Sequence, residues 1–150
     1  MTEAQFKTLK AVLMQNRQWI LKKSSGDTSG WCVVSAIRVN HFLKKHGFTP
    51  ELIMVWCDGM CHCFNHLKDR ETYILDVTAD QFYPDFPFVL KERDKVSEDD
   101  HYWFWAWDED GGEGDSHFST NRRKILNYAK DWGYQSPQEA LRGIVKVKVN

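Results

Sequence analysis

The chain has 150 residues and a formal net charge of −1. This length suits one domain with its own hydrophobic core, so we expect a single domain over residues 1–150. A nearly neutral chain lacks the basic excess of nucleic-acid-binding proteins, and the sequence has no apolar run of membrane-spanning length; we therefore expect neither a nucleic-acid nor a membrane partner. The first residues form no apolar signal core, which predicts a cytoplasmic protein whose four cysteines stay reduced.

The first predicted element is a helix over the N-terminal segment. Thr2 and Gln5 match a capping box, and apolar residues recur at helical spacing as far as Ile20. A polar loop, residues 24–30, ends this pattern.

A second helix is predicted to begin near Trp31, with Ser29 as its N-cap. An apolar stripe continues to Leu43, and Gly47 suits the position just after the last turn. The two helices are thus joined by a short loop that contains Gly26 and Gly30.

After the second helix the pattern becomes extended. We predict strands over residues 52–56, 60–67 and 72–78, with Asp58-Gly59 as a hairpin turn between the first two. Because polar turns connect these strands directly, they are expected to form an antiparallel meander.

The rest of the chain gives weaker signals. Two prolines among aromatic residues predict an ordered loop over 82–88, an aromatic run predicts an extended segment over 101–107, and acidic residues with glycines predict a loop over 108–115. A helix is expected over 120–132, and alternating valine and lysine predict a strand over 144–149. Between this helix and this strand, a short helix is expected to begin at the capping pattern of Ser136, Pro137 and Glu139. The order of elements predicts an α+β fold with N-terminal helices packed on an antiparallel sheet.

Cys32 stands apart from the other three cysteines, which lie together on the predicted hairpin. If Ser29 is the N-cap, Cys32 is the third residue of the second helix. A helix N-terminus favours a thiolate through its dipole and free amides, and the thiolate is the nucleophilic form of cysteine. Cys32 is therefore the candidate nucleophile.

A cysteine nucleophile needs a histidine beside it and a group that orients the histidine. A turn centred on Asp69 would place His62 directly opposite Asp76 on an antiparallel pair of strands, within side-chain reach. His66 would then face Thr72 beside the turn. A register error of one residue at the turn would make the contact between His62 and Asp76 diagonal.

The order cysteine, histidine, aspartate resembles the transglutaminase-like branch of the papain-like superfamily. Three segments carry the resemblance, which covers residues 28–82: Gly30-Trp31-Cys32, His62-Cys63-Phe64, and Ile74-Leu75-Asp76-Val77-Thr78-Ala79-Asp80-Gln81-Phe82. The family's usual histidine motif has alanine and tryptophan where this chain has Cys63 and Phe64.

The resemblance implies a papain-like fold and a catalytic triad of Cys32, His62 and Asp76. Cys32 would attack an amide or peptide carbonyl and form a thioester, which water hydrolyses or an amine accepts as in a transglutaminase-type acyltransferase. A protein or peptide substrate is expected, with Trp31 and Gln81 as candidate substrate-binding residues, and with no cofactor or metal.

Three other interpretations remain open at this point. Cys32 can be an ordinary buried core residue, and the fold can serve a catalytically silent binding or inhibitory protein. Five sulfur and nitrogen ligands for zinc also occur within ten residues of the hairpin: Cys57, Cys61, His62, Cys63 and His66. Side chains of adjacent strand residues point to opposite faces, which argues against a shared metal.

Overall fold

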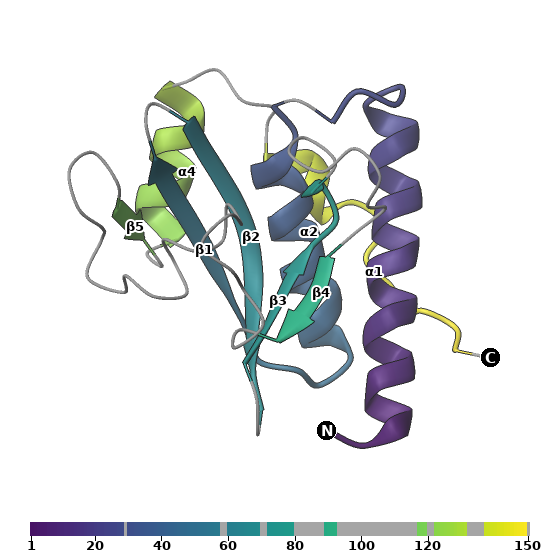
Figure 1. Ribbon diagram of the computed structural model, residues 1–150. Helices are drawn as coiled ribbons and strands as arrows, with labels where there is room; N and C mark the ends of the chain where they lie inside the picture. Colours follow the sequence, from purple (N-terminus) through teal and green to yellow (C-terminus); the bar gives the residue numbers. More distant parts are fainter. Residues whose placement is uncertain are drawn as a thin grey trace.

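The structure is a computed structural model that describes residues 1–28, 30–57, 60–69, 72–79, 89–92, 117–119, 122–131 and 137–149. The described elements form an α+β fold, as the sequence predicts (Figure 1). Helix α1 (Glu3–Lys23) begins at the predicted capping box. The amide of Gln5 donates to Thr2 Oγ1 at 3.1 Å, and the amide of Thr2 donates to Gln5 Oε1 at 2.8 Å.

Helix α2 (Cys32–Lys45) begins two residues later than the predicted cap implies. Trp31 is its N-cap, so the choice of Ser29 was wrong, and Cys32 is the first helical residue rather than the third. The reason is a turn before the helix, in which the amide of Trp31 bonds the carbonyl of Thr28 at 3.0 Å and Gly30 has a φ of +78°. The predicted end at Gly47 is confirmed, because its φ of +86° closes the helix as a left-handed residue does.

Among the described residues, five antiparallel strands form a sheet in the order β4-β3-β2-β1-β5. The first three strands confirm the predicted meander, whereas β4 and β5 were not predicted. Residues Cys57 and Met60 pair, so two residues connect β1 to β2, as the hairpin prediction requires. The bounds are β1 (Pro50–Cys57), β2 (Met60–Lys68), β3 (Thr72–Asp76), β4 (Val89–Glu92) and β5 (His117–Ser119).

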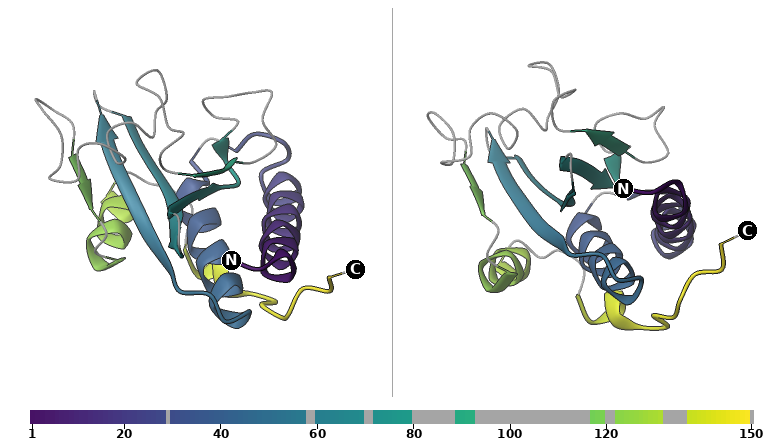
Figure 2. Two further views of the ribbon diagram at one scale, coloured as in Figure 1. Left: turned by 60° about the horizontal axis from the view of Figure 1, so that its bottom comes forward. Right: turned by 90° about the horizontal axis from the view of Figure 1, so that it is seen from below.

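Helix α2 lies at the centre of the fold, between α1 and the β1–β2 hairpin (Figure 2). Its first turn belongs to a buried cluster that includes Cys32, Met54 of β1 and Cys63 of β2, together with residues of α4 (Arg122–Asp131) and η3 (Pro137–Leu141). A second cluster joins α1, the later turns of α2 and the end of β3. The start of α2 is therefore held against the sheet at β1 and β2.

Towards the C-terminus the predictions are partly confirmed. Helix α4 corresponds to the helix expected over 120–132, and η3 is a 3₁₀ helix where a short helix was expected. The predicted loops over 82–88 and 108–115 and the extended segment over 101–107 lie outside the described residues.

The predicted strand over 144–149 was wrong: these residues form no strand. Ile144 and Val147 pack against the second cluster, while Val145 is 60% exposed. The two packed residues are three apart instead of two, so this irregular segment uses its apolar residues differently from a strand. The amide of Val147 also donates to Nε2 of His46, at the end of α2, at 2.9 Å.

This contact predicts a pH effect at the C-terminal segment. Burial and the neighbouring Lys146 lower the pKa of His46, and only the neutral imidazole can accept from Val147. Above pH 6.5 the contact is complete, and it is lost as the pH falls through the lowered pKa. Amide exchange of Val147, corrected for intrinsic rate, should accelerate on acidification, whereas His46→Gln should remove this pH dependence. An exchange profile that is unchanged by the substitution would contradict the prediction.

Within the described part of the chain, no helix is both long and apolar enough to cross a membrane.

Candidate active site

The three candidate catalytic residues come from three different elements and are all buried. Cys32 opens α2, His62 lies on β2, and Asp76 is the last residue of β3. Their exposed fractions are 1%, 4% and 3%. The hydrophobic cluster around α2 and the β-sheet hydrogen bonds therefore fix the backbone that carries each of them.

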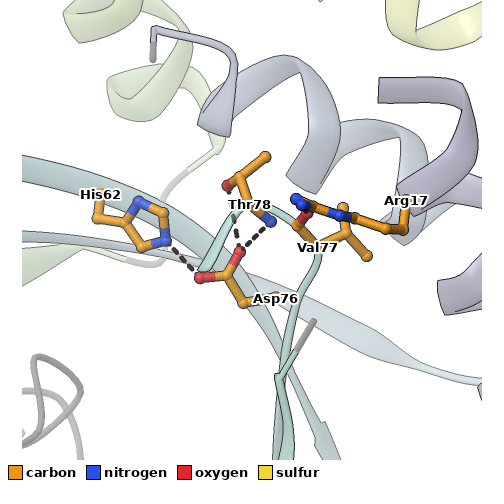
Figure 3. A network of polar contacts seen from close by, with 5 residues as sticks. All are labelled: Arg17, His62, Asp76, Val77 and Thr78. Atoms are coloured by element: carbon orange, nitrogen blue, oxygen red, sulfur yellow. Dashed lines mark hydrogen bonds and ion pairs between the residues drawn. The ribbon is translucent and has the colours of Figure 1, made fainter. Parts of the chain in front are cut away.

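The predicted contact between His62 and Asp76 is present: His62 Nε2 donates to Asp76 Oδ2 (Figure 3). The predicted register was wrong, however, because His66 lies opposite Ile74 instead of Thr72. With Asn65 opposite Leu75, His62 is not directly opposite Asp76, so their contact is diagonal. Each residue of β2 thus faces a residue two positions further along β3 than predicted. Because side chains alternate between the two faces of a strand, such a shift keeps His62 and Asp76 on the same face, and their contact survives the error.

Cys32 is the other group that acts on the imidazole of His62. Burial alone lowers the pKa of His62, but the charge and hydrogen bond of Asp76, followed by a hydrogen bond and charge from Cys32, raise the pKa to about 10. The imidazole of His62 is therefore close to both the carboxylate of Asp76 and the thiol of Cys32. The site thus brings together a thiol, an imidazole and an acidic partner.

Asp76 is held by contacts that sequence reasoning did not find. Its Oδ1 accepts from the amide of Thr78 at 2.9 Å and from Thr78 Oγ1 at 3.2 Å. Val77 lies between Asp76 and Thr78 in the sequence, and its carbonyl accepts a hydrogen bond from Arg17 of α1 at 2.8 Å. The sequence held one signal for this contact: Arg17 is a charged residue on the apolar side of α1, between the buried residues Leu13 and Ile20.

The raised pKa of His62 predicts how this residue affects stability. The folded chain holds the proton of His62 up to about pH 10, whereas the unfolded chain releases it near pH 6.5. The stabilising contribution is therefore complete below pH 6.5 and is lost as the pH rises through about 10. We expect the free energy of unfolding of the wild type, relative to His62→Gln, to decline between these pH values in urea titrations. A difference that is constant with pH would contradict the assignment.

The remaining predicted site residues fall elsewhere. Trp31, a candidate substrate-binding residue, is half-buried and packs against both hydrophobic clusters, which is a structural role. Gln81 lies outside the described residues. His66 is paired with Glu51 at 3.4 Å across β1 and β2.

The zinc hypothesis gains no support. No group of three potential metal-ligating side chains comes together among the residues that the structure describes. Cys63 is buried in the hydrophobic cluster around α2, and the side chains of Cys57 and Cys61 are not among those described.

Comparison of the chain with protein-family models, with curated proteins and with solved structures finds no match.

Proposed function

We propose that the protein is a cysteine-dependent hydrolase of papain-like type that cleaves an amide or peptide bond through a thioester. One observation supports the proposal: His62 donates a hydrogen bond to Asp76, and Cys32, the first residue of a helix, is close enough to contribute to the raised pKa of the same imidazole. A nucleophile beside a base that is itself oriented by a third group is the arrangement that covalent acyl transfer requires.

In the proposed reaction the Cys32 thiolate attacks the carbonyl carbon of the substrate and forms a C–S bond. The imidazolium of His62 gives its proton to the leaving nitrogen as the C–N bond breaks, and an acyl thioester remains. His62, now neutral, takes a proton from water as the water attacks the thioester. The products are a carboxylic acid and the regenerated thiolate–imidazolium pair. Attack by an amine in place of water would give the acyltransferase outcome.

The start of α2 also suits the negative oxygen of the tetrahedral intermediate. The first amides of an α-helix have no intrahelical acceptor, and the helix dipole is positive at this end. Because Cys32 is the first helical residue, its own amide is the proposed oxyanion donor.

The burial of Cys32 favours a second candidate, a catalytically silent protein that keeps the same residues for structure. A thiol that is 1% exposed can meet a substrate only after neighbouring atoms move, and buried structural cysteines are inert. Transfer of an acyl group to Cys32 separates the two candidates.

The deciding experiment uses p-nitrophenyl acetate as a small, generic acyl donor. For the hydrolase we expect a burst of p-nitrophenol, an acetyl group mapped to Cys32 by mass spectrometry, and its release by hydroxylamine. The variant Cys32→Ala should lose the burst, whereas the matched variant Cys63→Ala, which removes another buried thiol of the same cluster, should keep it. Acetylation spread over several cysteines, or none on Cys32, would support the silent protein.

A further inference from the structure

The backbone that leaves strand β3 needs hydrogen-bond partners from outside the sheet. β3 ends at Asp76, so the carbonyl of Val77 and the amide of Thr78 lie beyond the paired residues. Both residues are buried, with exposed fractions of 2% and 0%. Buried backbone groups are almost always paired, because an unpaired one costs about as much as a lost hydrogen bond.

Two side chains meet this need from opposite directions. Asp76 Oδ1 accepts from the amide and the hydroxyl of Thr78, and Arg17 of α1 donates to the carbonyl of Val77. Figure 3 shows these residues in one chain of contacts that runs from Arg17 through residues 77 and 78 to Asp76 and His62. The carboxylate is thus tied at one oxygen to a backbone segment that α1 holds in place.

We propose that Arg17 is a positioning residue, which holds residues 77 and 78 so that Asp76 presents its other oxygen to His62. This inference rests on the proposed function for its catalytic meaning, but the positioning itself is independent of any substrate. In this network the proposed effect of Arg17 on Asp76 passes through Val77 and Thr78. Helix α1, which contributes none of the three candidate catalytic residues, would then control the strength of the pair that His62 and Asp76 form.

The test is the titration of His62 itself, followed by NMR of its imidazole and assigned with His62→Gln. In Arg17→Met the carbonyl of Val77 loses its donor and the carboxylate gains freedom, so the proton affinity of His62 should fall by about tenfold, one pKa unit. Arg17→Lys keeps a charged donor, so the proton affinity of His62 in this variant should lie between those in Arg17→Met and in the wild type. Lys7→Met removes the same charge from an exposed position of α1 and should titrate like the wild type.

A second pair of variants examines the link next to the carboxylate. Thr78→Val removes the hydroxyl donor and keeps the shape of the side chain, so it should also lower the proton affinity of His62, whereas Thr78→Ser should restore it. A merely structural role would change the melting temperature in these variants and leave the titration of His62 unmoved.

The outcomes are distinct. The proposal is wrong if folded Arg17→Met titrates like Lys7→Met. To guard against failure to fold, Arg17→Gln provides a polar replacement that also loses the long donor; if neither variant folds, Arg17 holds the fold together and the proposal is overturned. Because the titration needs no substrate, a response to Arg17 with no acylation of Cys32 would retain the positioning role and reject the hydrolase. Acylation of Cys32 without any change of the His62 titration in the Arg17 variants would support the hydrolase and reject the positioning role.

Discussion

Replacement of Asp76 by alanine is expected to destabilise the protein by about 3–5 kcal/mol at pH 7, the typical cost of removing one partner of a buried ion pair. The substitution leaves His62, which is 4% exposed, without its carboxylate, and it also removes the acceptor of Thr78. The imidazole then loses the interaction that raises its pKa, so burial dominates and favours its neutral form. In a chain of this size the melting temperature should fall by about 10 °C, as measured by calorimetry.

The double variant His62→Gln with Asp76→Asn is the matched control. It replaces the ion pair by two neutral groups of similar size, and asparagine keeps an oxygen for Thr78. Neutral replacement of a buried ion pair costs far less than removal of one partner, so the double variant should be more stable than Asp76→Ala. If Asp76→Ala unfolds at the temperature of the wild type, the buried pair is not formed in solution.

The elements that carry the three candidate residues could be predicted because each depends on residues close together in the sequence. The capping box at Thr2, the glycine end of α2 and the meander of β1, β2 and β3 follow from short patterns, and these elements place Cys32, His62 and Asp76. The contact between His62 and Asp76 survived an error in register because side chains alternate with a period of two.

What could not be predicted depends on contacts between distant segments. No local pattern indicates that Arg17 meets Val77, sixty residues away, or that β5 pairs with β1. The strand expected over 144–149 fails for the same kind of reason: alternating residues form a strand only where another strand offers free backbone groups, and here the amide of Val147 donates to the side chain of His46 instead. The start of α2 was misplaced because the turn before it is closed by a backbone hydrogen bond, which leaves no mark in the side-chain sequence.

The strongest effect on chemistry is expected at Cys32 when its partner is removed. Under the proposed mechanism, iodoacetamide at pH 5.5–6 should alkylate Cys32 in the wild type, because a cationic group beside a cysteine favours its nucleophilic form. In His62→Gln the charge is lost, and the rate at Cys32 should fall by at least about 100-fold, the lower range for a positioned acid–base partner. Cys63, buried in the same cluster, serves as the internal reference in both proteins. Peptide mapping that finds Cys32 and Cys63 equally slow in the wild type would reject the pair, since burial alone would then govern both thiols.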